Sequence, residues 1–357
     1  MLAKTEVGPT QGKLETIPIV RQAVAADSSA WNDFVFRQED GTFFHRHEWG
    51  DVLRCAFGHK TYFLLAEIDG QISGVLPLAQ VKSALFGNAL VSTPFCVYGG
   101  IVAADHLAFA ALQSAACELA ESLGVDYLEM RNRHRRHPEW PVKDLYVSFQ
   151  RVISPDSETN MLAIPRKQRA MVRKGMQKGL QVRMDTDVGD LYRMYAESLR
   201  NLGTPVVAKS YLQLLQQVFA GDAEILTITH EGAAVSSVMN FRFRNQILPY
   251  YGGGSSAARA LAANDFMYWQ VMERARAQGL TSFDFGRSKR GTGAFDFKSN
   301  WGFEPRSLYY EYFLVRAKQV PNLSPTNPKY SRSIQLWKRL PLPIANFIGP
   351  HVARYLG

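Results

Sequence analysis

Apolar residues recur along this chain with the period of helices in some segments and the period of strands in others. In the first half, a strand at 16–24 precedes two helices, a hairpin that turns at Asp69-Gly70, a strand, a long amphipathic helix and a last strand. The predicted ranges of these elements are 28–35, 48–57, 61–67 with 72–81, 90–98, 105–123 and 125–130. Asp-Gly between two β-rich runs is a strong hairpin signal.

The second half predicts the same order of elements. Two helices around Leu191 and Leu214 precede a hairpin at 223–243, a strand that ends at Tyr250-Tyr251, a helix capped by Asn264 and a strand at 281–285. Glycines that end corresponding elements lie 162, 153 and 155 residues apart, in the pairs Gly70 and Gly232, Gly99 and Gly252, and Gly124 and Gly279. This repeat predicts two tandem α+β domains of like fold, at 15–150 and 164–316. A mobile lead-in at 1–14, a connector at 151–163 and a C-terminal tail at 317–357 complete the predicted organisation.

Composition adds a preference for anionic partners. Of the 357 residues 46% are hydrophobic and 20% charged, which allows a sizeable core, and the net charge is +9. Three widely spaced cysteines form no disulfide framework or metal-binding pattern, which favours a reducing compartment. We recognise neither a signal peptide nor an apolar run of about 18 residues, so the expected location is cytoplasmic, either free or peripheral to the inner membrane.

A glycine-rich basic stretch at 283–305 is the main candidate for a binding site. Arg287, Lys289 and Arg290 follow the predicted strand, and glycines there permit close approach of the backbone to a ligand. Such cations suit a phosphate, although a solvated basic hairpin has the same composition. Phenylalanines interleaved with the cations favour a partly desolvated binding site.

A second basic segment at 166–178 is predicted to be a helix with one narrow apolar edge. Arg169 and Arg173 are four residues apart, so they share a face and are candidates to bind a phosphate. The alternative is a solvated helix at a domain boundary.

Several short motifs resemble those of the FemAB-like transferases, whose two domains have the fold of the Gcn5-related N-acetyltransferases, with mostly antiparallel sheets flanked by helices. The motifs are Phe43-Phe44-His45 with Trp49, Tyr251-Gly252-Gly253, Asp284-Phe285-Gly286, and Phe297-Lys298 with Trp301-Gly302. The resemblance spans about 15–316 and is greatest to the branch associated with exosortase/PEP-CTERM systems of exopolysaccharide-producing bacteria. It implies transfer of an acyl or aminoacyl group from an activated donor to an amine of a cell-envelope precursor related to peptidoglycan or exopolysaccharide.

The resemblance also implies roles for individual residues. Lys298 matches a family lysine near the transferred acyl group and the donor's terminal phosphate, and Arg54 lies near the place of a lysine that binds the acceptor's phosphates. The coiled-coil arm of family members that use charged tRNA is missing, and so is the R/Q-x-x-G-x-G/A signature for CoA. Gly252 and Gly253, with the residues that follow, can still offer backbone N–H groups to a phosphate.

Direct attack of an amine on an acyl donor is the expected mechanism, because no Ser-His-Asp or Cys-His set is apparent. Lys298 would neutralise the developing negative charge, while Arg287, Lys289 and Arg290 hold phosphate. Asp284 would orient or deprotonate the amine, or else simply pair with Arg287. The remaining candidates for substrate binding are Tyr98, Tyr251, His45, Trp49 and Trp301.

Three functions stay open on the sequence. The first is aminoacyl or acyl transfer as above, with aminoacyl-tRNA as donor; the second is an N-acyltransferase that uses CoA or an acyl carrier protein. The third is a non-catalytic protein that binds RNA or a phosphate-bearing glycolipid. None requires a metal or a bound cofactor.

The tail at 334–357 mixes aliphatic and aromatic residues with Lys338, Arg339 and Arg354, and its prolines predict short segments. Either this apolar set packs on the second domain, or it contacts a membrane surface.

Overall fold

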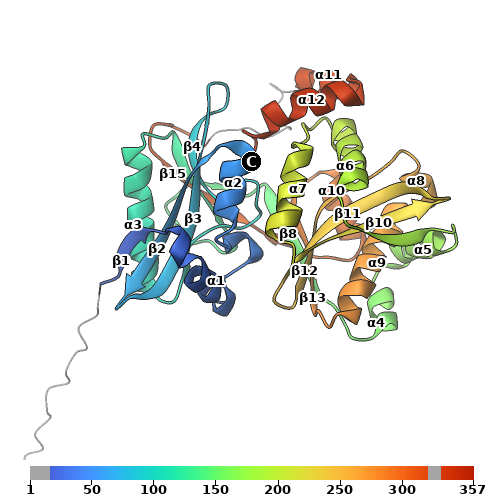
Figure 1. The fold of residues 1–357 in the computed structure, drawn as a ribbon, viewed down its shortest axis with the longest axis horizontal. Helices are drawn as coiled ribbons and strands as arrows, with labels where there is room; N and C mark the ends of the chain where they lie inside the picture. The colour runs from blue at the N-terminus through green and yellow to red at the C-terminus, as the bar shows by residue number, and fades with distance from the viewer. Residues whose placement is uncertain (1–16, 321–330) are drawn as a thin grey trace, which may run out of the picture.

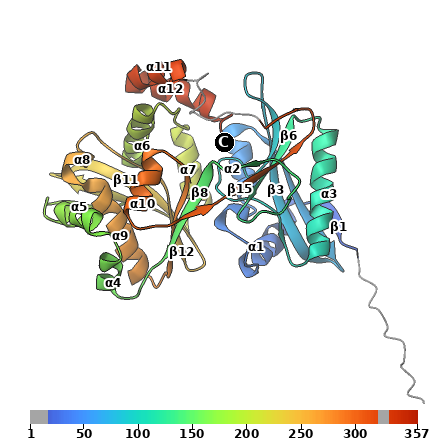
Figure 2. The same ribbon diagram turned by 180° about the vertical axis from the view of Figure 1, so that it is seen from behind.

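The computed structural model describes residues 17–320 and 331–357, so the expected lead-in at 1–14 lies outside the described residues. Two twisted sheets stand side by side, each flanked by helices, as Figures 1 and 2 show from opposite sides. This arrangement confirms the predicted α+β class.

The first sheet has the strand order β1-β2-β3-β4-β6-β15-β7, with β5 paired to β3. Its strands are β1 (Ile19–Gln22), β2 (Lys60–Ile68), β3 (Gln71–Ser83), β4 (Gly87–Ser92), β5 (Val102–Ala103), β6 (Tyr127–Asn132), β7 (Val142–Lys143) and β15 (Tyr309–Leu314). Its helices are α1 (Ser28–Arg37), α2 (Trp49–Phe57) and α3 (His106–Ser122). Helix α3 begins where the Asp105 carboxylate accepts a hydrogen bond from the Ala108 N–H at 2.8 Å, as the sequence predicts for a cap.

The second sheet has the order β9-β10-β11-β12-β13-β8-β14. Its strands are β8 (Tyr146–Val152), β9 (Gln181–Asp185), β10 (Ala223–His230), β11 (Ala233–Phe243), β12 (Gln246–Gly254), β13 (Ser282–Lys289) and β14 (Pro305–Ser307). Its helices are α4 (Ser157–Leu162), α5 (Arg166–Met176), α6 (Gly189–Leu202), α7 (Lys209–Val218), α8 (Ala258–Leu261), α9 (Ala263–Ala277) and α10 (Gly293–Asn300). In each sheet one neighbouring pair is parallel, β4 with β6 and β12 with β13, and these pairs hold equivalent places in the two strand orders.

Each sheet is completed by a strand from the other half of the chain. Strand β8 lies within the predicted first domain but pairs with β13 and β14, and β15 lies within the predicted second domain but pairs with β6 and β7. The boundaries expected at 150 and 164 therefore do not separate the two sheets. Alternation of apolar residues indicates a strand but not the sheet edge to which it adds, because that pairing depends on tertiary packing.

Three predicted elements differ in the structure. The strand expected at 90–98 ends at Ser92, because Thr93 and Phe95 adopt φ values of 40° and 69° that a strand does not allow. Asn264 lies inside α9, whose N-cap is Ala262. The segment after Thr292, for which a solvated basic hairpin was the alternative to a binding site, is helix α10, and the Thr292 hydroxyl caps it.

A continuous aromatic core joins the two halves. Phe43, in a short 3-10 turn before α2, stacks on Phe241 of β11 with ring centroids 4.5 Å apart, and also contacts Phe219. Arg46 forms an ion pair with Asp222 at 2.5 Å across the same boundary. These contacts fix the position of the loops between the sheets, where the candidate site lies.

The C-terminal residues form helices α11 (Ser331–Arg339) and α12 (Leu342–Ala353), which pack against α6. The chain then enters the space between the halves, where Arg354 hydrogen-bonds to the Phe57 carbonyl and the Gly357 carbonyl accepts a bond from Arg131 at 2.9 Å. Within the described residues, no helix combines the length and apolarity needed to cross a membrane.

Candidate active site

A cavity of about 360 Å³ opens where β12 and β13 separate. The two strands pair in parallel only at Gln246 with Ser282 and Ile247 with Phe283, and then diverge. Pro249 has no N–H to donate, and Gly286 adopts φ 66° within an irregularity of β13. The separation therefore follows from the local sequence of both strands.

Three parts of the molecule form the cavity walls. The second half contributes β12, β13, Lys298 of α10, and side chains of α6 and its following loop, among them Tyr195. The first half contributes Phe95 and Val97 from the loop after β4, and the C-terminal segment contributes Ala353, Leu356 and Gly357.

Lys298 points its amine at the backbone of β13. The Nζ donates hydrogen bonds to the carbonyls of Phe285, Gly286 and Arg287 at 2.6, 3.3 and 3.1 Å. Three such bonds match the ammonium form, because a neutral amine has only two N–H groups. Burial, with the nearby Arg287, lowers the pKa of Lys298 to about 7, although Asp284 acts in the opposite direction. Lys298 therefore both fixes the irregular turn of β13 and places a positive charge at the cavity.

Arg287 supplies a second positive charge to the cavity wall. Its guanidinium donates to the Tyr310 hydroxyl at 2.9 Å and lies 4.7 Å from the ring centroid of Tyr146. Within the described part of the chain Arg287 makes no salt bridge, and no aspartate or glutamate lines the cavity. The cavity is thus electropositive and suited to an anionic group.

Asp284 is buried beside the cavity and does not line it. Its carboxylate accepts hydrogen bonds from Gln150 at 2.8 Å, from the Gly286 N–H at 2.7 Å and from the Tyr98 hydroxyl at 3.2 Å. Burial raises the pKa of the Asp284 carboxyl, whereas these three hydrogen bonds act to lower it. The predicted pairing of Asp284 with Arg287 is wrong, and Asp284 instead joins β13 to the loop of the first half that carries Tyr98.

The two predicted tyrosines face different spaces. Tyr251 lines the cavity and shares a 2.7 Å hydrogen bond between its hydroxyl and that of Tyr211. Tyr98 lines a separate space of about 100 Å³ together with Arg133. Only Tyr251 therefore joins Lys298 and Arg287.

Gly252 and Gly253 allow close packing of β12 against its neighbours. Both lie in β12, paired with Val238 and Ser237 of β11. A Cβ at Gly253 would stand 2.4 Å from the backbone oxygen of Met194 in α6, so only glycine permits this approach. The motif that suggested a phosphate loop is therefore a strand pressed against a helix.

The predicted tryptophans are both core residues. Trp301 is completely buried and donates from its indole to Asp265 at 3.0 Å. Trp49 is also completely buried and donates to the Phe43 carbonyl at 3.0 Å. Neither residue can contact a substrate in this arrangement.

Three predicted cations lie away from the cavity. Arg54 is exposed on α2, where it pairs with Asp51 and bonds to Thr61. Arg290 is exposed and bonds to Ser307. Lys289 stands 5.7 Å from the ring centroid of Tyr146, and burial together with Arg287 and Lys143 lowers its pKa to about 8.

His45 is buried in the first half and is held as a neutral ring. Its Nε2 donates to the Gly100 carbonyl at 3.0 Å, and its Nδ1 accepts from the Thr42 N–H at 3.2 Å and the Thr42 hydroxyl at 2.8 Å. Burial lowers the pKa of His45 to about 4. A proton on Nδ1 would point at the Thr42 N–H, which is also a donor. This hydrogen bond therefore favours the neutral ring, as burial does.

His45 should therefore make the protein less stable in mild acid. Between pH 6.5 and 4 the unfolded chain binds a proton at this histidine that the folded protein rejects, so stability falls as the pH falls. We expect His45 to contribute a loss of about 2 kcal/mol between pH 7 and pH 5. Urea unfolding at both pH values measures this loss, and His45→Gln should show a correspondingly flatter dependence. An equal dependence in both proteins would contradict the prediction.

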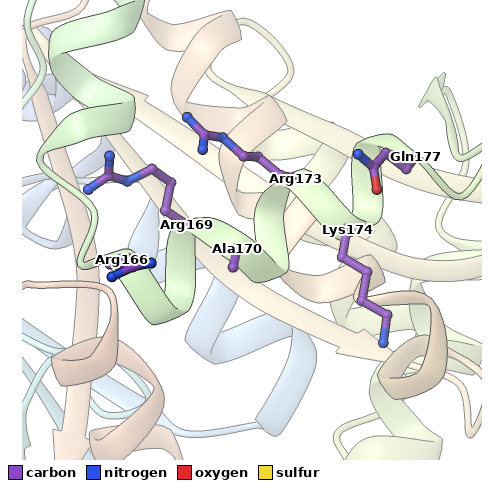
Figure 3. A pocket seen from close by; sticks show the side chains of 6 residues that line it. All are labelled: Arg166, Arg169, Ala170, Arg173, Lys174 and Gln177. Carbon is purple, nitrogen blue, oxygen red and sulfur yellow. The ribbon is translucent and has the colours of Figure 1, made fainter.

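The predicted basic helix is present as α5, and its exposed side forms an open groove of about 410 Å³. Figure 3 shows Arg169 and Arg173 extending in the same direction from the helix, while Lys174 points away. None of the α5 cations forms a salt bridge with another described residue. Gly175 lets α5 pack closely on α9, since a Cβ there would lie 2.8 Å from Phe266. Arg173 is exposed and available to a phosphate, whereas Arg169 already donates to the carbonyls of Ile164 and Leu162 at 3.2 and 3.4 Å. Both are separate from the group around Lys298.

Apart from Tyr251, sequence reasoning missed the residues that the cavity takes from outside the basic stretch. Phe95, Tyr195 and Leu356 come from three distant segments. The one available signal was helical spacing, which placed Tyr195 on the same predicted helix face as Leu191.

Comparisons with known proteins agree with this geometry. Residues 166–299 match the model of the acetyltransferase (GNAT) domain, and this range includes β12, β13 and Lys298. No curated protein matches the chain by sequence.

Solved structures match over most of the chain. A crystal structure of FemX has 14% identity and a TM-score of 0.63 over 89% of this chain and 100% of its own. The C-terminal domain of a putative lysylphosphatidylglycerol synthetase from Agrobacterium fabrum has 14% identity and a TM-score of 0.55, over 81% of this chain and 92% of its own. A tandem GNAT protein from the clavulanic acid biosynthesis pathway has 14% identity and a TM-score of 0.50, over 84% of this chain and 98% of its own. The described chain thus has a tandem GNAT fold, and its residues 166–299 match the GNAT acetyltransferase domain model.

Proposed function

We propose that this protein is an acyltransferase that moves an acyl or aminoacyl group from a phosphate-bearing donor to an amine. One observation carries the proposal. The half that matches the acetyltransferase domain holds a cavity at its separated parallel strands, and Arg287 and Lys298 leave that cavity positively charged. A donor phosphate would neutralise Arg287, while the acyl group lies toward Lys298.

In this reaction the neutral amine attacks the donor's acyl carbon, and the carbonyl oxygen becomes negatively charged. The ammonium of Lys298 would stabilise that charge in a partly dehydrated site. Collapse of the intermediate forms the amide and releases the donor's oxygen or sulfur, which takes up the proton lost by the amine. Burial raises the pKa of Tyr251 well above its usual range, so its hydroxyl stays protonated and positions groups by hydrogen bonding.

The open groove on α5 is the proposed docking surface for the donor's carrier. Arg169 and Arg173 present cations without carboxylate partners, which suits either the phosphates of an RNA or the acidic surface of a carrier protein. The acceptor is proposed to be an amine of a cell-envelope precursor. The FemAB-like motifs support this choice, and their exosortase-associated branch points to an exopolysaccharide context.

The donor class can be tested directly by ligand-induced thermal stabilisation. A ligand that binds only the native state raises the melting temperature, so acyl-CoA thioesters and aminoacyl-tRNA are screened as donors, and nucleotide-linked sugar peptides are screened separately as acceptors. Mass spectrometry of mixtures that contain a stabilising donor then detects the amide product. Stabilisation by RNA or glycolipid without any product would favour the non-catalytic alternative.

Arg287 and Arg290 provide a matched pair of variants. Arg287→Gln should weaken binding of the stabilising donor by about tenfold or more, because a charge-assisted bond to phosphate is lost. Arg290→Gln should change binding less than twofold, since Arg290 is exposed and outside the cavity. Calorimetric titration measures both constants, and an equal loss in the two variants would reject the proposed phosphate position.

A further inference from the structure

Helices α11 and α12 and the end of α6 carry several exposed apolar side chains. Side chains of Leu336, Ile344 and Phe347 are 67%, 46% and 76% exposed, and Ile348 is also exposed. Ile344, Phe347 and Ile348 have the spacing of one helix face. Leu202 of α6 is exposed beside Gly203, which contacts Ile334 of α11. We call these five exposed residues, Leu202, Leu336, Ile344, Phe347 and Ile348, the apolar edge.

The segment that carries most of this edge has a strongly one-sided charge. Residues 331–357 include four lysines and arginines and no aspartate or glutamate. Arg332, Lys338 and Arg339 are exposed on α11, and none of them forms a salt bridge within the described residues. Exposed apolar side chains flanked by unpaired cations are the combination that an anionic lipid surface attracts.

The same segment connects the edge to the cavity. After α12 the chain passes along the cavity, where Ala353, Leu356 and Gly357 form part of the wall. His59 of the first half holds this passage through a 2.8 Å contact between its Nε2 and the Arg354 carbonyl. Figures 1 and 2 show α11 and α12 along the upper edge of the molecule beside α6, with the C-terminus below them between the halves. The segment that carries the edge therefore continues into the cavity wall.

We propose that the apolar edge docks on an anionic bilayer and so brings the cavity to an acceptor substrate carried by a lipid. The side chains of Ile344 and Phe347 enter the headgroup region, while Arg332, Lys338 and Arg339 contact lipid phosphates. A two-fold contact between copies fits less well, because it would bring together two segments that carry lysines and arginines and no aspartate or glutamate. Helices α11 and α12 are held in place by their contacts with α6. Their exposed side chains therefore remain available for docking.

Co-sedimentation of the full chain with vesicles tests the docking without any acyl donor. The chain should pellet with vesicles of phosphatidylglycerol and phosphatidylcholine, and not with phosphatidylcholine alone. The double variant Ile344→Ser with Phe347→Ser should lower the partition coefficient about tenfold or more, because it removes two apolar anchors. Lys338→Glu with Arg339→Glu should lower it for anionic vesicles as well.

Leu162→Ser is the matched control, since Leu162 is an exposed leucine of α4, far from α11 and α12. It should leave binding unchanged, and all variants should keep the melting temperature of the original chain. Failure of the original chain to pellet with anionic vesicles, or equal pelleting of the double serine variant, would overturn the proposal. So would a dimer in solution that the double serine variant dissociates, because the edge would then join two copies. An inactive but vesicle-bound protein would instead count against the proposed acyl transfer alone.

Discussion

Replacing Lys298 by alanine is expected to lower the turnover number by about 10² to 10³-fold, the effect of losing one group that stabilises an oxyanion. The variant removes the ammonium from the cavity and leaves the carbonyls of Phe285, Gly286 and Arg287 without this donor. Because these three bonds also fix the turn of β13, the melting temperature should fall as well, so turnover is compared at a temperature at which the variant is folded. Single-turnover kinetics with the donor found by thermal stabilisation measures the effect on the chemical step.

Lys289→Ala is the control for charge alone. Lys289 is also a lysine beside Arg287, but it does not line the cavity. Its replacement should change turnover less than about threefold. Equal effects of the two substitutions would show that total charge matters and not the position of Lys298, and unchanged turnover in Lys298→Ala would remove Lys298 from the mechanism.

Replacing Trp301 by alanine should produce the largest loss of stability, about 3–5 kcal/mol in the free energy of unfolding. The side chain is completely buried in the second core, with Phe285 and Phe297 beside it. The substitution leaves a cavity and also deprives Asp265 of its indole partner. Urea unfolding followed by circular dichroism gives the difference.

Phe347→Ala is the control for this measurement, because its aromatic ring is 76% exposed and its loss should cost within about 0.5 kcal/mol. A loss below about 1 kcal/mol in Trp301→Ala, together with weaker donor binding, would contradict the packing role. Trp301 would then be a binding residue, as its motif suggested.

The apolar periodicity predicted most helices and both hairpins because each depends on residues close in the chain. The turn at Asp69-Gly70, for example, lies between β2 and β3 as expected. The exchange of β8 and β15 was not predictable in the same way. Both strands have ordinary strand patterns, and only the packing of the assembled sheets decides which edge each one joins.

The sequence indicated site residues whose charge suits the cavity. It did not distinguish motif residues that contact a substrate from motif residues that are buried in the core. Of the cations that stood out in the glycine-rich stretch, Arg287 lines the cavity and Lys289 and Arg290 do not, while Lys298, assigned through the family resemblance, does line it. Trp49, His45 and Trp301 belong to equally distinctive motifs, yet the structure buries all three. Motif similarity cannot separate packing from contact with a substrate, because both restrict the choice of residue.

A crystal structure with a non-hydrolysable donor analogue would test the central claim most directly. The account predicts the analogue's phosphate on Arg287 and its acyl carbon within reach of Lys298, between the separated strands β12 and β13. An analogue bound instead beside Tyr98 in the first half, or along α5 with its acyl group outside the cavity, would contradict it.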